Sequence, residues 1–381
     1  NCDKGRWAFK YVTSLDRLTH PLVRNAEGEL VQASWPEALA AAAAGLKGKR
    51  AAVLTGGRVT TEDAYGYSKF ARIALGTNDI DYRARVTSDE ERDFLAAHVA
   101  GSSTTYRDID TADHVALVAF EPEEESPIVF LRLNKNFKKR GLKVSAVATK
   151  GSIAMDKLKA DFIKVAPGAE SSAVAGLALT AKSVILVGER ATESAGLFTS
   201  VAALAAKTGA KVAYIPRRAG ERGALEAGAL GNVLPGGRPV MDAAARVDIA
   251  AAWGVDSLPA TPGRSALEII NALTSGDLDA VVVGGVDALD LPHGREAIAA
   301  LKKSFVVSLA IAPSSVTAVA DVVLPVAAIT EKSGSFLNWE GRARAFDSAV
   351  ADSHNRSDVR ILSMLADALG NPISLGTVTS S

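Results

Sequence analysis

The chain alternates short apolar runs with longer segments in which apolar residues recur at helical spacing. The runs are bounded by glycine, proline or acidic turns, which is typical of strands buried on both faces of a sheet. Because strands and helices alternate in this way, the sequence predicts an α/β fold with doubly wound parallel sheets. We expect strands at 51–55, 115–120, 143–147, 162–165, 184–187, 211–215, 280–284, 305–309 and 321–324.

Capping residues mark the helices between these strands. Ser34 and Glu37 begin a helix that runs to about Leu46. A Ser or Thr hydroxyl at a helix start satisfies a free backbone N–H group, and a glutamate three residues later can return the bond. Thr60 marks a helix over 61–75 in the same way. Further helices are expected after the acidic turn 121–127 and over 358–369.

Three segments show neither a short apolar run nor apolar residues at helical spacing. Residues up to about Gly28 are polar and predict irregular structure. The stretch 216–264 is rich in glycine, proline and arginine and interrupts the alternation, and 331–346 reads as a polar turn with aromatic anchors. A loop as long as 216–264 usually has a binding or packing role.

Composition narrows the class of protein. The 381 residues carry 43 basic and 43 acidic side chains, so the basic excess that nucleic acid or an anionic membrane requires is missing. No apolar run reaches membrane-spanning length. A single cysteine excludes a disulfide framework and suits a reducing compartment. We expect a soluble intracellular protein of two or three domains, and Asn1-Cys2 without an initiator Met predicts a piece of something longer.

Self-contained catalytic motifs are missing from the sequence, and the candidate chemistry is scattered. Cys2 is followed by Lys4 and Arg6, whose charges would stabilise a thiolate or an anionic cluster, although a lone cysteine is more often a small buried apolar residue. The glutamates of 121–125 could be a metal site, but a solvated helix start is favoured. The histidines are expected to be structural or exposed; they are His20, His98, His114, His293 and His354.

The loop 76–88, GTNDIDYRARVTS, is the strongest candidate for a ligand site. It carries acids, amides, Arg83 and Arg85, and Ser88 with Glu91 forms a capping-box pair for the helix that it opens. A helix start presents free N–H groups, which suit an anion or a metal-bound anionic ligand. The cap itself offers only hydroxyls, since it reads Thr87-Ser88. In the 216–264 stretch, arginines could cradle a phosphate or hold a loop against the sheet or a partner; they are Arg217, Arg218, Arg222 and Arg238.

Five segments follow one another in an order that resembles the molybdopterin oxidoreductase family, which includes formate dehydrogenases and nitrate reductases. The resemblance covers Cys2 to about Leu369. The NWEGR form, and the residues at positions 87 and 88, make the chain most similar to one branch of the family, the large iron–sulfur subunits of bacterial NADH–quinone oxidoreductase (respiratory complex I). The segments are CDKGR with DRLTHPLVR, GTNDIDYRARV, ADHVALVAFEPEEESPI, GALEAGALGNVLPGG and ADVVLPVAAITEKSGSFLNWEGR.

The resemblance assigns roles to five residues. Cys2 matches the last ligand of a [4Fe–4S] cluster whose other ligands would lie upstream, and Lys4 matches the lysine beside that cluster. Thr87 stands where catalytic members ligate molybdenum or tungsten, and Ser88 where formate dehydrogenases use a histidine for proton transfer. Glu121 replaces an asparagine that helps to hold the pterin nucleotide. A threonine hydroxyl is a poor substitute for a thiolate, so no catalytic residue and no molybdenum cofactor are expected.

The resemblance also implies an organisation and a function. Residues 1–34 would end the iron–sulfur domain, 35–85 with 256–370 would form a discontinuous α/β domain, 86–255 would be an inserted Rossmann-like domain, and 371–381 a tail. The family's C-terminal β-barrel has no counterpart. The implied role is a scaffold in the peripheral arm, which carries electrons from NADH through FMN and iron–sulfur clusters to quinone, coupled to proton translocation.

The implied partners are the other peripheral-arm subunits, on the cytoplasmic side of the bacterial plasma membrane, without membrane insertion. Two alternatives stay open. The first is an active molybdenum or tungsten bis-pterin oxidoreductase, similar to formate dehydrogenase, with Thr87 as an alkoxide ligand. The second is a binding module whose old cofactor cleft holds another nucleotide, with Arg222 or Arg238 as contacts.

Overall fold

The computed structural model describes residues 3–350 and 353–375, and the chain forms two compact units. Unit 1 contains residues up to Val86, then Gly223–Phe336 and Arg344 onward; unit 2 contains Thr87–Arg222 and Leu337–Ala343. The long segment of unit 2 runs from Thr87 to Arg222. Residues 223–255 return to unit 1, because they pack on its helices and not on the sheet of unit 2.

Unit 1 is built on a seven-stranded sheet in the order β2-β1-β14-β13-β12-β3-β4. The five strands from β14 to β4 are parallel, while β1 and β2 are antiparallel at one edge. All residues of β3 and β12 are buried, which explains why these strands are apolar without alternation. The strands are β1 (Leu22–Arg24), β2 (Leu30–Gln32), β3 (Ala51–Thr55), β4 (Ile80–Asp81), β12 (Ala280–Gly284), β13 (Phe305–Ala310) and β14 (Val322–Pro325).

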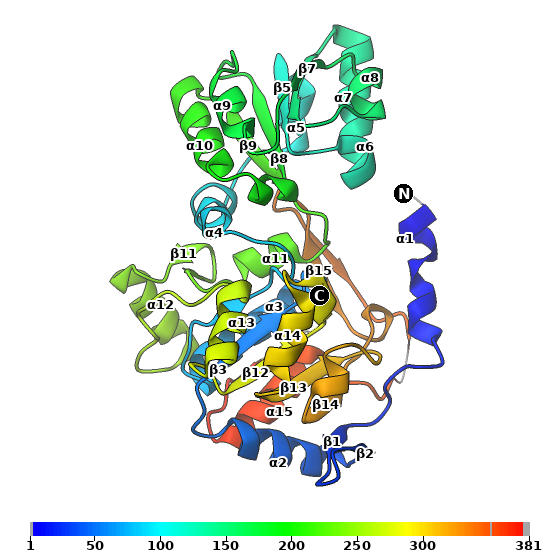
Figure 1. Cartoon of the computed structure of the whole chain (residues 1–381), viewed down its shortest axis with the longest axis vertical. Helices are drawn as coiled ribbons and strands as arrows, with labels where there is room; N and C mark the ends of the chain where they lie inside the picture. The colour runs from blue at the N-terminus through cyan, green and yellow to red at the C-terminus, as the bar shows by residue number, and fades with distance from the viewer. Residues whose placement is uncertain (1–2, 351–352, 376–381) are drawn as a thin grey trace. The chain divides into compact units, whose positions relative to one another are not determined.

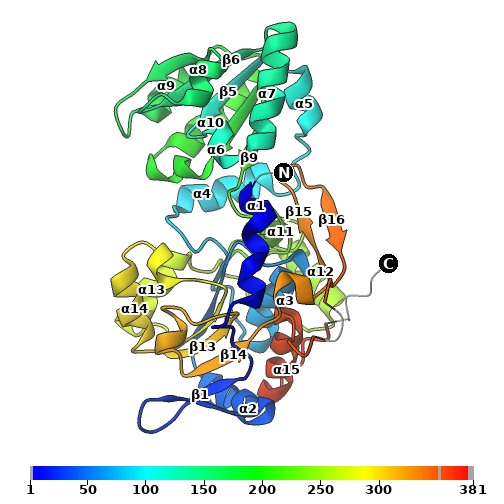
Figure 2. The same ribbon diagram turned by 90° about the vertical axis from the view of Figure 1, so that its right-hand side faces the viewer.

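Helices cover both faces of this sheet, as Figures 1 and 2 show. α13 (Ala266–Ser275) and α14 (Gly294–Leu301) lie on one face and pack on alternate side chains of β3 and β12, such as Leu54 and Val283. On the other face lie α2 (Trp35–Leu46), α3 (Thr61–Lys69) with the π-helical turn η2 (Phe70–Ala74), and α15 (Asp358–Leu369). The predicted helices beginning at Ser34 and Thr60 are confirmed, including the Ser34–Glu37 capping box.

The prediction of irregular structure for the residues up to about Gly28 holds for 14–21 and 25–28 but was wrong for the rest of the described part. There the chain forms α1 (Asp3–Trp7), the 3₁₀ helix η1 (Ala8–Thr13) and β1. For β1 the cause is tertiary: this strand hydrogen-bonds to β14, so a short polar segment gains a sheet edge that local sequence does not reveal.

The 216–264 stretch is also more regular than its composition predicts. It contains α11 (Glu221–Glu226), the short hairpin β10 (Val233–Leu234) and β11 (Arg238–Pro239), and α12 (Ala243–Trp253). Residues 331–346 form a second hairpin rather than a turn, with β15 (Gly334–Leu337) and β16 (Ala343–Phe346). The remaining short helices of unit 1 are η5 (Ala288–Asp290), η6 (Thr317–Val319) and η7 (Ile329–Glu331).

Unit 2 is a Rossmann-like layer structure with an all-parallel sheet in the order β7-β6-β5-β8-β9. Its strands are β5 (His114–Val118), β6 (Lys143–Ala148), β7 (Asp161–Lys164), β8 (Val184–Gly188) and β9 (Lys211–Ile215). Its helices are α4 (Asp89–Phe94) continued by the π-helical η3 (Leu95–Val99), α5 (Tyr106–Thr111), α6 (Pro122–Glu125), α7 (Pro127–Arg140), α8 (Ile153–Lys157), α9 (Glu170–Ala175), the 3₁₀ helix η4 (Glu189–Glu193) and α10 (Leu197–Thr208).

In unit 2, α5 and α7 lie on one face of the sheet and α9 and α10 on the other (Figure 2). Phe130 and Leu133 of α7 pack on the apolar strand β5, and Trp339 from the 337–343 segment joins the same core. The expected doubly wound fold class is confirmed in both units. Among the described residues, no helix combines the length and apolarity that a membrane crossing needs.

Candidate functional site

The polar loop before α4 uses its side chains within unit 1. Asp81 and Arg83 form a fully buried ion pair, with Nη2 2.8 Å from Oδ2, and the same carboxylate accepts the Ala266 N–H at the start of α13. The Asn78 amide accepts from Arg72 and donates to the carbonyls of Pro259 and Thr261. These polar groups therefore hold the chain in place.

Thr87 and Ser88 lie in unit 2 at the start of α4. Thr87 is half-buried. Ser88 caps the helix, since its Oγ accepts from the Glu91 N–H at 3.1 Å, and it also accepts from the Thr192 hydroxyl at 3.0 Å. The Glu91 carboxylate accepts from Tyr214, at 2.9 Å. The N-cap is confirmed, but this carboxylate makes a contact across unit 2 that the capping-box pattern does not predict.

Acidic residues occupy the first turn of α4, which is only six residues long. Their charge offsets the positive end of the helix dipole, so an incoming anion gains little there. The Glu90 carboxylate turns instead to the start of α10, where it accepts from the Gly196 and Thr199 N–H groups at 2.9 and 2.6 Å. The helix start predicted to receive a ligand is therefore neutralised by the chain.

Carboxylates also lie at the carboxyl edge of the unit 2 sheet. In a doubly wound sheet a ligand binds where the strand order reverses, here between β5 and β8. Glu121 follows β5, and its Oε2 is buried without a hydrogen-bond partner among the described residues. Glu125, with 5% of its side chain exposed, pairs with Arg190 and Arg217. The prediction that 121–125 is a solvated helix start was thus wrong for Glu125, because sheet topology buries it.

A cavity of about 440 Å³ opens at the corresponding edge of unit 1. It lies at the carboxyl ends of β3, β12, β13 and β14, next to the reversal of strand order between β3 and β12. Backbones meet closely there: the Gly56 N–H donates to the Gly284 carbonyl at 2.8 Å, and a Cβ on Gly56 would lie 2.2 Å from the Gly285 oxygen. The charged side chains that line the cavity are Arg58, Asp287, Asp290, Lys332 and Asp358.

Two of these lining residues belong to a buried charge cluster. Lys332 bonds to Asp63 on α3 and to Asp358 at the start of α15, and Tyr67 donates to Asp358 at 2.8 Å. Burial, followed by the charge of Asp358, raises the pKa of Asp63. Burial acts to lower the pKa of Lys332, but the two carboxylates outweigh it and the pKa is raised. Sequence reasoning missed this cluster, since its members lie far apart in the chain.

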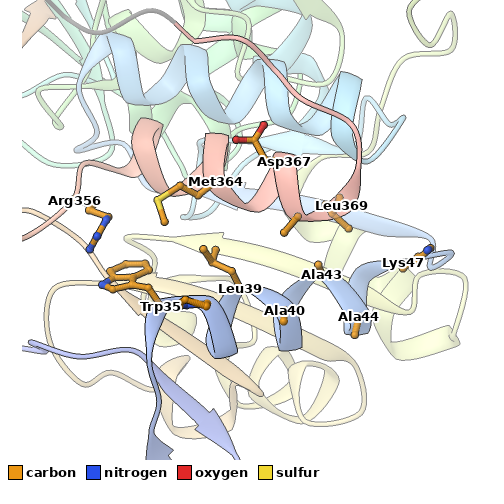
Figure 3. Close-up of a pocket in the computed structure, with 12 residues that line it drawn as sticks. Trp35, Leu39, Ala40, Ala43, Ala44, Lys47, Arg356, Met364, Asp367 and Leu369 are labelled. Atoms are coloured by element: carbon orange, nitrogen blue, oxygen red, sulfur yellow. The ribbon is translucent and has the colours of Figure 1, made fainter.

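A second recess, a groove of about 850 Å³, lies between α2 and α15 on the surface of unit 1. Figure 3 shows its apolar floor, formed by alanines and leucines of both helices, with Lys47, Arg356 and Asp367 at its edges. The Arg356 guanidinium lies over the Trp35 ring, 4.5 Å from its centroid. The rest of the lining is apolar, apart from these three charged side chains.

The other candidates have structural roles or lie outside the described residues. Cys2 belongs to the residues that are not described, and Lys4 lies in α1. His114 is buried and bonds to Ser145; burial lowers its pKa. In the described part of the chain, no group of three or more His, Cys, Asp or Glu side chains could hold a metal ion.

The arginines of the 216–264 stretch do not gather in one site. Arg222 donates to the carbonyl of Trp339 at 2.7 Å, and Arg238 pairs with Asp248. Arg217 and Arg218 follow β9 and bond to Glu125 and Glu189. The glutamate run after β5 and the double arginine after β9 were the signals from which this last contact could have been inferred.

Comparison with known proteins gives concordant matches. The molybdopterin oxidoreductase family model matches residues 17–368. The chain is 51% identical over 408 residues to the G subunit of NADH-quinone oxidoreductase from Streptomyces coelicolor, covering 97% of this chain and 48% of the relative. It is 48% identical over 400 residues to the protein of the same name in Mycobacterium tuberculosis, covering 100% of this chain and 50% of the relative. The chain thus spans about half the length of these relatives.

A solved structure with the same fold is acetylene hydratase from Pelobacter acetylenicus. It superposes with a TM-score of 0.65 at 14% sequence identity, covering 97% of this chain and 64% of that one. At this identity the match concerns the fold alone.

Proposed function

The chain belongs to the molybdopterin oxidoreductase family, and from that premise we propose that it is a non-catalytic scaffold region of the large iron–sulfur subunit in a NADH–quinone oxidoreductase. The relatives at 48–51% identity are named as the G subunit of that enzyme. In the proposed role the chain contributes Cys2 to a [4Fe–4S] cluster and offers surface to the other peripheral-arm subunits, on the cytoplasmic side of the membrane. The enzyme as a whole passes electrons from NADH to quinone.

The observation that carries the non-catalytic part is the misfit between this chain and a pterin–molybdenum cofactor. The buried Glu121 oxygen and the Glu125 carboxylate lie at the switch point of unit 2, where a pterin nucleotide would need donors to its phosphates. Thr87 offers a hydroxyl in place of a thiolate, and the Ser88 hydroxyl caps the helix. The two glutamates would repel the cofactor's phosphates, and the two hydroxyls are poor metal ligands. No step of catalysis is therefore assigned to the cofactor.

The iron–sulfur part rests on the family match of Cys2 and Lys4. A thiolate is the usual ligand of a [4Fe–4S] cluster, and the two cations Lys4 and Arg6 suit the cluster's negative charge. In the same proposal, unit 2 is the inserted Rossmann-like domain.

The test is elemental analysis of the native, untruncated protein in its purified assembly, for iron, molybdenum and tungsten. We expect iron in excess of what the clusters further upstream need, with neither of the other metals at stoichiometric level. Stoichiometric molybdenum or tungsten would instead mean a second catalytic centre and would refute the scaffold role.

The cluster ligand is tested separately by variants. Cys2→Ser is expected to remove one [4Fe–4S] signal from the electron paramagnetic resonance spectrum and the corresponding iron. Lys4→Gln should keep the cluster and lower its midpoint potential, because one nearby positive charge is lost. Lys10→Gln, which removes an exposed charge further along the same segment, is the matched control and should change neither. An unchanged spectrum in Cys2→Ser would exclude Cys2 as a ligand.

A further inference from the structure

The carboxyl edge of the unit 2 sheet holds a lattice of ion pairs drawn from three loops. Glu125 lies on α6 after β5, Glu189 and Arg190 lie on η4 after β8, and Arg217 and Arg218 follow β9. The reversal of strand order falls between β5 and β8. These loops therefore converge on the place where a parallel α/β sheet receives its ligand.

Both oxygens of Glu125 and of Glu189 face an arginine of the chain itself. Glu125 Oε1 lies 2.9 Å from Arg190 Nη2 and 3.0 Å from the Glu121 nitrogen, and Glu125 Oε2 lies 3.1 Å from Arg217 Nε. Glu189 Oε1 lies 3.5 Å from Arg217 Nη1, and Glu189 Oε2 lies 3.0 Å from Arg218 Nη1. Two carboxylates thus fill the positions that phosphate oxygens take when arginines bind an anion.

The carboxylates of the lattice are more deeply buried than its arginines. The side chains of Glu125 and Glu189 are 5% and 9% exposed, whereas those of Arg190 and Arg217 are 45% and 37% exposed. The arginines cover the carboxylates as they would cover a bound anion. A buried carboxylate is stable only when it is paired and hydrogen-bonded, so these contacts define the structure of the edge.

Acids at least match the arginines of the lattice. Arg190, Arg217 and Arg218 supply three positive charges. Glu125, Glu189 and Glu221, which pairs with Arg218, supply three negative ones, and the charge of Glu193 also acts on Arg217. Burial acts to lower the pKa of Arg217, but its bond to Glu125 and the surrounding acids raise it overall. A phosphate group arriving at this edge meets no excess of positive charge.

We propose that Arg190, Arg217 and Arg218 form an anion-binding cluster whose occupant is the chain's own pair of carboxylates, Glu125 and Glu189. The carboxylates take the place of the phosphates of a nucleotide, and they keep the arginines folded without a ligand. This inference rests on the proposed loss of the pterin nucleotide and specifies what replaced it. Neutralising a carboxylate opens the cluster to a phosphate-bearing anion.

The test measures thermal unfolding of the intact protein with inorganic pyrophosphate, against sodium chloride of equal ionic strength. Glu125→Gln is expected to unfold at a lower temperature than the parent protein in chloride, and pyrophosphate should raise that temperature by roughly 4 °C. The parent protein should show no such rise. Glu124→Gln is the matched control, because Glu124 is exposed on the same helix, and it should behave like the parent.

Two further variants keep the result decisive. Glu189→Gln opens the cluster from the other carboxylate, and it replaces Glu125→Gln if that variant does not fold. Adding Arg217→Gln to either should abolish the response to pyrophosphate. The inference is overturned if pyrophosphate stabilises the parent protein or Glu124→Gln to the same extent, or if neither opened variant responds. Metal content of the native assembly is independent of these outcomes, so failure here leaves the scaffold proposal standing.

Discussion

The ammonium group of Lys332 lies 3.1 Å from a carboxylate oxygen of Asp358 and is shared with Asp63. The three side chains are only 2–11% exposed. They join the loop before β15 to the first turns of α3 and α15. One cation thus holds together three segments that the sequence places far apart, and a buried pair of this kind is costly to break.

Replacing Lys332 by Met is therefore expected to destabilise unit 1 by about 3–5 kcal/mol at neutral pH, since two buried carboxylates lose their counter-charge. Chemical denaturation measures this. Lys303→Met, which removes an exposed lysine of the same unit, should have little effect. A loss below about 1 kcal/mol would show that solvent screens the cluster.

The same cluster predicts a pH dependence. The pKa of Asp63 is raised in the folded state, so its protonation contributes stability that is present below its unfolded pKa and is lost as the pH rises through the folded value. In Lys332→Met the pKa of Asp63 should rise further, because the nearby positive charge is removed. We expect the deficit of this variant to be larger at pH 8 than at pH 5, measured by denaturation at both values. An equal deficit at the two pH values would contradict this further rise.

For Glu331 we expect the opposite dependence of stability on pH. Burial acts to raise its pKa, but bonds from Arg17, the Ala328 N–H and Asn355 hold the pKa below its usual range. Its contribution is present above the unfolded pKa near 4.5 and is lost as the pH falls through the folded value. Glu331→Gln should cost about 1–3 kcal/mol at neutral pH, with a deficit that shrinks on acidification.

The control for this prediction is Glu27→Gln, an exposed glutamate between β1 and β2. Its stability should follow that of the parent protein across the pH range. If Glu331→Gln keeps its full deficit in acid, the loss comes from packing and not from the charge of the carboxylate.

Arg72 anchors part of the 216–264 stretch through hydrogen bonds. Its buried guanidinium donates to the carbonyls of Gly228, Leu230 and Val233, and burial lowers its pKa to about 9. Arg72→Met removes a donor from each of these carbonyls; Gly228 keeps the Ser68 hydroxyl and Leu230 keeps the Val233 N–H. We expect a loss of roughly 1–3 kcal/mol, mainly from the unpaired Val233 carbonyl. Hydrogen exchange should accelerate first at residues 228–233. Arg360→Met, an exposed arginine on α15, should leave exchange there unchanged.

Thr87→Cys tests the proposed reason for the absence of molybdenum. A thiolate would supply a soft ligand at that position, but Glu121 and Glu125 would remain at the carboxyl edge of the unit 2 sheet. We expect the native assembly carrying Thr87→Cys to contain no more molybdenum than the parent, by elemental analysis. Stoichiometric molybdenum in the variant would show that the carboxylates do not exclude the cofactor.

Local sequence was sufficient for most of the regular structure. Strands such as 51–55 and 211–215 were predicted to the residue, as was the final helix 358–369. Their signals lie within a few residues: continuous apolar runs, a serine before the helix, and glycine after it. The hairpin 331–346 was missed because its aromatic anchors also suit a turn, and only strand pairing distinguishes the two.

What the sequence by itself determined is the α/β class and the family, because these depend on residue identity and order. The tertiary structure decided which charges meet. Lys332 and Asp63, or Glu125 and Arg217, are separated by long stretches of chain, and their contacts exist only because the sheets bring strand ends together. Long-range burial turns these charged residues from solvated groups into structural ones, and no local pattern encodes it.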